Sequence, residues 1–174
     1  MDLDRTDHQI LALLQEDGRR TNVQIAETVA LSPSPCLRRI KRLEADGVIL
    51  GYRAIIDREA VGLGLTVLVE IKVGQHSQDN ARTLQEALAD MPEVVACHMI
   101  SGTADFIAEV VVRDLKDYER ILTERLLVLP MITDIRSNFS LKRIKSEAPL
   151  PLPLSDGVRR GGKDGSGSVR KAKQ

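Results

Sequence analysis

The spacing of apolar residues changes near residue 60, and this change constrains the fold more than any other feature of the 174-residue chain. Before that point apolar residues recur every three or four positions, as in Leu37, Ile40 and Leu43, which is the period of an amphipathic helix. From Leu65 to Val73 they alternate with polar residues such as Glu70, which is the period of a strand. We therefore predict an α+β chain in which a helical domain precedes a domain built on a β-sheet.

Two helices are predicted in the first thirty residues. Asp4 is suited to cap the first helix and Gly18 to end it. Thr21-Asn22-Val23-Gln24 has the pattern of a capping box, in which the Thr hydroxyl and the Gln amide each satisfy a free backbone group. The inward side of this second helix is expected to carry Val23, Ala26 and Val29.

A longer helix is predicted after a three-residue turn, Ala30-Leu31-Ser32. Ser32 caps it, and Pro33 takes its first position, where a missing N–H costs nothing. Gly47 ends it, and Cys36 beside the inward stripe Leu37, Ile40 and Leu43 is expected to be a small apolar filler. A helix, a short turn and a longer helix have the spacing of a helix-turn-helix, whose second helix enters the major groove of DNA.

The rest of the chain is predicted to form a strand-rich domain and a tail. A strand over residues 48–56 is expected to leave the helical domain, and Gly62 and Gly64 mark the boundary. The later elements have the order βαββαβ of a ferredoxin-like sheet with two helices on one side. They are a strand at 65–73, a helix at 79–91, strands at 94–100 and 106–112, a helix capped by Asp114, and a strand at 132–141. The predicted domains are residues 1–60, 61–145 and a tail at 146–174 that is Pro-rich, then basic, Gly/Ser-rich and disordered.

Two helices cover only one face of such a sheet, yet two of the predicted strands are apolar on both faces. We expect Val95, Cys97 and Met99 to oppose Val94, Ala96 and Ile100, and Ile107 and Val111 to oppose Phe106, Ala108, Val110 and Val112. A strand with two apolar faces needs two partners. We therefore predict that a second subunit covers the other face, most simply across a two-fold axis.

The net charge is zero, but its distribution favours DNA binding. Residues 1–148 carry 19 Lys and Arg against 23 Asp and Glu, whereas residues 149–174 carry six against two. Within the acidic body, four basic residues gather on the third predicted helix, where Ser34, Arg38, Lys41 and Arg42 are expected to point outward, with Arg39 at the border. Such side chains suit base edges and phosphates. The alternative is a solvated charged face on an ordinary three-helix domain.

Several other classes of protein are excluded by the sequence. The polar, acidic start is unlike a secretory signal, and no apolar run approaches the length of a membrane span. Cys36 and Cys97 make no disulfide framework and suit a reducing cytoplasm. Cys97 and His98 would point to opposite faces of a strand, so they form no catalytic pair. We therefore expect no enzyme, metal or cofactor.

Three stretches carry a family resemblance: Leu3-Asp4-Arg5 with Asp7, Leu31 to Glu44, and Gly47 to Tyr52. Together with Cys97 to Phe106 and Leu129-Pro130, they resemble the leucine-responsive/asparagine regulator (Lrp/AsnC) family of transcription factors over residues 2–145. The resemblance implies a winged helix-turn-helix that binds double-stranded DNA, and a ferredoxin-like domain that dimerises, assembles into octamers and senses amino acids between subunits. The DNA contacts then lie between about Asn22 and Lys41, with candidates Asn22, Ser32, Ser34, Pro35, Arg38, Arg39, Lys41 and Arg42.

The resemblance also assigns a candidate effector site to the connector between two strands. Backbone N–H groups at Gly102 and Thr103 suit a carboxylate, and Asp105 suits an ammonium group. The candidate effector-binding residues are Ser101, Gly102, Thr103 and Asp105, followed by Thr133 and Asp134. From the residues alone, a polar Gly turn that joins two strands indicates a hairpin and nothing more, and only the resemblance favours an effector contact. Met131 and Ile135 depart from the family pattern near this site, so the effector, leucine or another amino acid, is left open.

Taken together, these features predict a cytoplasmic, nucleoid-associated transcriptional regulator whose assembly or DNA affinity responds to an amino acid. The alternative is an architectural DNA-binding protein without a small-molecule effector.

Overall fold

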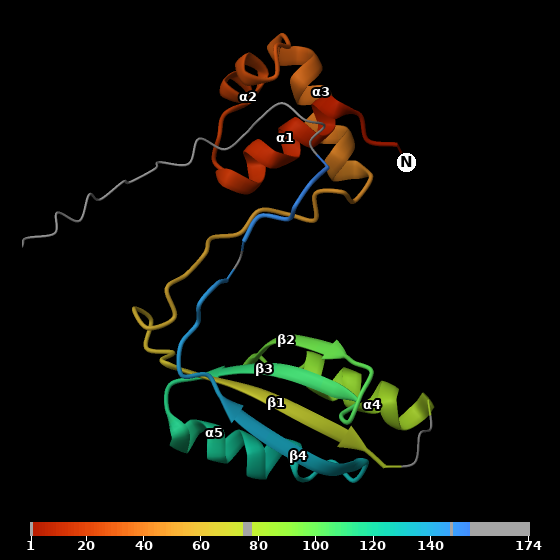
Figure 1. Ribbon diagram of the computed structural model, residues 1–174, viewed down its shortest axis with the longest axis vertical. Coiled ribbons are helices and arrows are strands. Elements are labelled where there is room, and N and C mark those ends of the chain that lie inside the picture. Colours follow the sequence, from red (N-terminus) through yellow and green to blue (C-terminus); the bar gives the residue numbers. More distant parts are fainter. Residues whose placement is uncertain (1, 75–77, 147, 154–174) are drawn as a thin grey trace, which may run out of the picture. The chain divides into compact units, whose positions relative to one another are not determined.

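The computed structural model describes residues 2–74, 78–146 and 148–153, and it divides the chain into two compact units. Of the described residues, 2–54 and 148–153 form the first unit, and 55–74 with 78–146 form the second (Figure 1). A disordered tail was predicted at residues 146–174. Residues 147 and 154–174 of that tail lie outside the described residues.

The first unit contains three helices, α1 (Arg5–Glu16), α2 (Asn22–Thr28) and α3 (Pro33–Ala45). Capping boxes begin the first two, since Asp4 and Thr21 accept from the backbone N–H of Asp7 and Gln24 at 2.8 and 3.3 Å. Ser32 is the N-cap of α3 and Pro33 its first residue, as predicted, but the Ser32 hydroxyl makes no capping hydrogen bond.

The helical core differs from the prediction at two positions. Val23 and Leu37 were expected inside, but they are 51% and 43% exposed. The buried row of α2 is centred on Ile25 and Ala26 instead. In α3 the buried row runs through Cys36, Ile40 and Leu43, with spacings of four and three, so Leu37 is turned about 100° away from Cys36. The small Cys36 therefore occupies the position that the prediction gave to a leucine.

The predicted strand at 48–56 is not formed. Residues 50–57 have no regular secondary structure, and Leu50, Tyr52, Ile55 and Ile56 are exposed. A strand requires a neighbouring strand to pair with, and the sheet of the described residues, β2-β3-β1-β4, does not include this segment. The prediction counted apolar residues and could not show where a partner strand would lie.

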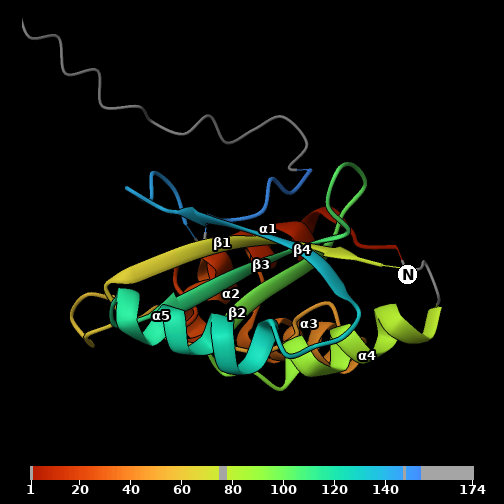
Figure 2. The same cartoon turned by 90° about the horizontal axis from the view of Figure 1, so that it is seen from below.

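The second unit is an antiparallel sheet of order β2-β3-β1-β4, the ferredoxin-like arrangement that was predicted. Figure 2 shows α4 and α5 on the same side of this sheet. The strands are β1 (Leu65–Val73), β2 (Val94–Met99), β3 (Phe106–Val112) and β4 (Ile132–Phe139). The helices are α4 (Gln78–Ala89) and α5 (Leu115–Ile121), and a π-helical turn, Leu122–Leu126, continues α5.

A β-bulge corrects one predicted face. The register of β2 against β3 shifts between Val94 and Ala96, so that Val94 pairs with Val110 and Cys97 with Ala108. Val110 belongs to the core under the helices, and Ala108 is buried beside it. Val94, Cys97 and Met99 therefore share the helix-covered side, whereas the prediction placed Val94 opposite the other two. The extra residue of a bulge reverses the alternation that follows it.

The open face of the sheet is more polar than its apolar residues indicated. Ile107 and Val111 lie on it as predicted, but Glu109 stands between them and accepts from Arg58 Nη1 at 2.6 Å. On the neighbouring strand, Glu70 accepts from Asn138 Nδ2 at 3.1 Å. This face therefore alternates apolar patches with polar, hydrogen-bonded groups.

The turn of the helix-turn-helix contains the only left-handed residue other than glycine in the described chain, Ala30 at φ +55°. The N–H groups of Ala30 and Leu31 donate back to Glu27 O and Ala26 O at 3.4 and 2.9 Å, the bonds of a Schellman motif. Glycine normally takes this position because a Cβ disfavours the left-handed conformation.

We therefore predict that Ala30→Gly stabilises the helical unit by about 1 kcal/mol, since it removes the cost of a left-handed alanine. Urea unfolding followed by helical circular dichroism measures the change. Ala12→Gly inside α1 is the control and should destabilise by a similar amount. Destabilisation by Ala30→Gly would contradict this account of the turn.

Candidate functional site

The outward side of α3 presents three of the predicted DNA contacts. Ser34, Arg38 and Lys41 are exposed and recur at spacings of four and three residues, so they lie on one side of the helix. Arg38 and Lys41 form no ion pair with any of the described residues. Their cationic groups are therefore free to meet an anionic partner.

Arg39 and Arg42 are placed differently, because both contact α1. Arg39 Nη1 lies 2.6 Å from Asp4 Oδ2 and 2.9 Å from Asp7 Oδ1, and Arg42 Nη2 lies 2.5 Å from Asp7 Oδ2. The hydrogen bonds to Asp4 and Asp7 raise the pKa of Arg39. The Asp7 backbone N–H and then Arg39 lower the pKa of Asp4. The basic cluster is thus divided into two free and two paired cations.

The other candidates surround the start of α3. Asn22 Nδ2 donates to Pro33 O at 2.8 Å and ties the first turn of α2 to the first residue of α3. Its Oδ1 is buried and finds no hydrogen-bond partner among the described residues. Ser32 is exposed and Pro35 is half-buried. Asn22 therefore helps to hold α2 against the start of α3.

The strand connector at 100–105 brings Asp105 to the end of β1. Asp105 N–H donates to Ile71 O at 3.0 Å, and its carboxylate accepts from Val73 N–H at 2.8 Å. This contact lies where the pairing of β1 with β4 shifts between Lys72 and Val73. The Asp105 carboxylate therefore stabilises the irregular end of β1.

A cavity of about 180 Å³ lies beside this connector and unites two of the candidates, Thr103 and Asp134. Its complete lining is Glu70, Lys72, Thr103, Ala104, Asp134 and Arg136. The other candidates, Ser101, Gly102, Asp105 and Thr133, are not in this lining. Ser101 and Gly102 are exposed, and Thr133 Oγ1 donates to Lys72 O at 3.2 Å.

Sequence reasoning did not assign Glu70, Lys72 and Arg136 to the site. The signal for the first two was present, because the alternation of β1 places them on the face opposite its buried valines. Arg136 Nε lies 3.5 Å from Asp134 Oδ2. Two anionic and two cationic side chains therefore line one cavity, which suits a ligand that carries both charges.

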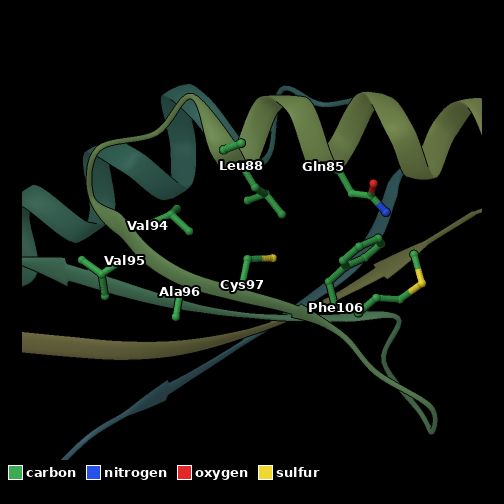
Figure 3. Close-up of a pocket in the computed structure, with 9 residues that line it drawn as sticks. Gln85, Leu88, Val94, Val95, Ala96, Cys97 and Phe106 are labelled. Carbon is green, nitrogen blue, oxygen red and sulfur yellow. The ribbon is translucent and has the colours of Figure 1, made fainter. Parts of the chain in front are cut away.

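A second cavity, of about 390 Å³, opens between α4 and the edge strand β2 (Figure 3). Its lining is almost wholly apolar, and Gln85 is its polar exception. Figure 3 shows Cys97 pointing from β2 toward Leu88 of α4, and burial raises the pKa of this thiol. With no charged group in the lining, this cavity offers no partner for a carboxylate or an ammonium group. Cys97 and His98 pair with Ala108 and Ile107, on opposite faces, as predicted.

The described ranges contain neither a metal-binding cluster nor a membrane-spanning helix. No group of three or more His, Cys, Asp and Glu side chains there is placed to hold a metal ion. Nor is any helix of those ranges long and apolar enough to cross a membrane.

Comparison with known proteins assigns a family to both units. Residues 3–49 match the winged helix-turn-helix DNA-binding family, and residues 66–150 match the Lrp/AsnC ligand binding domain. The chain is 38% identical over 151 residues to the leucine-responsive regulatory protein of Escherichia coli, which covers 87% of this chain and 92% of that protein. The same protein of Klebsiella pneumoniae is equally similar.

Solved structures agree with this assignment. A transcriptional regulator from Neisseria meningitidis, solved in complex with L-Met, has a TM-score of 0.82 and 38% identity, covering 87% of this chain and 98% of that one. An AsnC family regulator from Agrobacterium tumefaciens has a TM-score of 0.81 and 36% identity, covering 86% and 97%. Since these relatives are named as regulators, and since the two family models match both units in order, the chain belongs to the Lrp/AsnC family of transcriptional regulators.

Proposed function

We propose that this regulator reads double-stranded DNA with the side of α3 that carries Ser34, Arg38 and Lys41. The observation that supports this is the exposure of two unpaired cations on the second helix of the motif. Lys and Arg side chains suit phosphates and guanine, and a serine hydroxyl can hydrogen-bond to a phosphate or to a base edge. Asn22, Ser32 and Pro35 flank this side of α3. Arg39 and Arg42 lie next to it, but both are ion-paired with Asp7 of α1.

The cavity of Glu70, Lys72, Thr103, Asp134 and Arg136 is our proposed amino-acid site. A free amino acid has an ammonium and a carboxylate a few ångströms apart, and the lining supplies carboxylates for the first and cations for the second. Ser101 and Gly102 would approach the ligand from the exposed connector, and Asp105 would set the position of that connector. The solved complex of the Neisseria relative with L-Met supports an amino acid as the class of effector.

We further propose that the open face of the sheet is an interface between two copies, which then assemble further, up to an octamer. Leu68 and Ile107 lie on this face and are not fully buried within one chain. The effector cavity opens among residues of the same face, so a ligand there would sit close to the neighbouring subunit. Binding would then favour one arrangement of paired α3 helices, and hence one spacing of DNA half-sites. As a DNA-binding regulator it would act in the cytoplasm, at the nucleoid.

The DNA face is tested by Arg38→Ala with Lys41→Ala. If both cations contact phosphates or bases, affinity for duplex DNA should fall at least tenfold, and the slope of log K against log salt should become shallower by about 1–2. Fluorescence anisotropy over a salt series measures both quantities. Arg82→Ala with Lys116→Ala removes the same charge from exposed sites of α4 and α5 and serves as the control. Retained affinity in the α3 variant would show that another surface binds DNA.

The effector site is tested in two steps. A screen of the twenty amino acids should find one or more that raise the melting temperature, since a ligand at 100 times its Kd stabilises by about 2.7 kcal/mol. Lys72→Met should then weaken that ligand about tenfold or more, because a hydrogen bond to a charged group is worth about 1.5–3 kcal/mol. Isothermal titration calorimetry measures the affinity, and Lys116→Met on α5 is the matched control.

No response to any amino acid would favour the alternative, an architectural DNA-binding protein without an effector. A ligand that binds with unchanged affinity to Lys72→Met would instead place the site elsewhere.

The interface is tested by Leu68→Lys, which places a charge in the middle of the open face. We expect it to dissociate the assembly, because an unpaired buried charge opposes association. Light scattering after size-exclusion chromatography measures the mass. Leu127→Lys, at an exposed position that follows the π-helical turn, is the control. An unchanged mass for Leu68→Lys would exclude this face as the interface.

A further inference from the structure

Asp7 is the one charged residue that is buried in the described chain, with 1% of its surface exposed. It lies in the first turn of α1, and its carboxylate accepts from Arg39 Nη1 at 2.9 Å and from Arg42 Nη2 at 2.5 Å. The backbone N–H of Asp4 adds a third hydrogen bond at 3.2 Å. Both carboxylate oxygens thus accept hydrogen bonds. Two of the three donors, Arg39 and Arg42, lie on α3, more than thirty residues away in the sequence.

Asp4 reinforces the same contact. Its Oδ2 accepts from Arg39 Nη1 at 2.6 Å, while its Oδ1 accepts from the backbone N–H of Asp7 at 2.8 Å. Two carboxylates, one on the N-cap of α1 and one in its first turn, therefore face two guanidinium groups of α3, and the four charges balance. The basic cluster that the sequence shows as four cations contributes only two net positive charges to its surroundings.

The two pairs form neighbouring rows on α3. Arg39 and Arg42 are three residues apart, as are Arg38 and Lys41, so each pair forms a row along the helix. The first row is ion-paired with Asp7 of α1, although 45% of the Arg42 side chain stays exposed. The second row is exposed and forms no ion pair with the described residues. If Arg39 and Arg42 left α1, the buried Asp7 carboxylate would lose both of its cationic partners, which is strongly unfavourable.

We propose that Asp7 is a positioning residue for DNA recognition, which holds the Arg39 and Arg42 row on α1 and so fixes which row of α3 meets DNA. The inference rests on the proposed DNA face. Cations that reach phosphates add affinity without sequence information. Withholding one row therefore raises specificity: the site keeps fewer phosphate contacts, and α3 keeps one rotation about its axis relative to α1.

Asp7→Asn tests this directly, because it removes the charge and retains the size and one acceptor. Released from Asp7, Arg39 and Arg42 should reach phosphates as well. We expect affinity for a scrambled duplex to rise three- to tenfold, and the slope of log K against log salt to steepen by about 1–2. The ratio of affinities for a duplex selected from a random pool by the wild-type chain, relative to the scrambled duplex, should fall at least tenfold.

Glu16→Gln is the matched control. Glu16 also lies on α1, is exposed, and pairs with Arg20 and not with α3. The substitution changes the net charge by the same unit, so any general electrostatic effect appears in both variants. A merely structural role for Asp7 would lower the melting temperature without steepening the salt dependence. Asp7→Asn with the slope and the affinity ratio of Glu16→Gln overturns the proposal.

Asp4→Asn decides the question if Asp7→Asn does not fold. Asparagine is as good an N-cap as aspartate, so α1 should persist, and only the Asp4 contact to Arg39 is lost. We expect a smaller change in the same direction, a slope steeper by up to 1; an unchanged slope overturns the proposal. Failure of the DNA face itself is distinguishable, because Arg38→Ala with Lys41→Ala would then bind DNA as the wild type does.

Discussion

The buried apolar row of β1 fixes which side of the sheet is available for binding. Val67, Val69, Ile71 and Val73 are buried under α4 and α5. Because successive side chains of a strand alternate, burial of this row turns Glu70 and Lys72 to the opposite face, into the cavity with Asp134 and Arg136. The register of β4 against β1 then sets which residues of β4 join them. The charges of the proposed amino-acid site are consequently placed by hydrophobic packing on the other side of the strand.

In the helical unit, too, burial of one row of side chains sets the orientation of the others, here with the helical period of 3.6 residues per turn. Burial of Cys36, Ile40 and Leu43 divides the remaining surface of α3 into two sides. One side meets the carboxylates of α1, and the other carries Arg38 and Lys41. In each unit, apolar burial selects the orientation, and ionic groups then define what the exposed side can bind.

Sequence reasoning predicted the architecture well because its strongest signals are local. The capping box at Thr21, Pro33 at the start of α3 and the alternation of β1 each depend on neighbours in the chain, and all three are confirmed. The errors come from long-range contacts. The segment at 48–56 joins no strand of the described sheet, and the bulge between Val94 and Ala96 reversed a face. Leu37 was placed inside, but the buried row of α3 runs through Cys36 instead.

The candidate sites show the same division. Ser34, Arg38 and Lys41 followed from helical phase, whereas the capture of Arg39 and Arg42 by Asp7 joins residues 32 and 35 positions apart, which no local pattern indicates. Likewise the connector around Thr103 was identified from the resemblance, but Arg136 joins it only through the pairing of β4 with β1.

The two sites matter for regulation only if they are coupled. The most direct measurement is the affinity of the full chain for its selected duplex, with and without a saturating concentration of the amino acid that stabilises it most. Our account predicts a change of at least fivefold, the lower end of ordinary allosteric coupling. Equal affinities in the two conditions would contradict it.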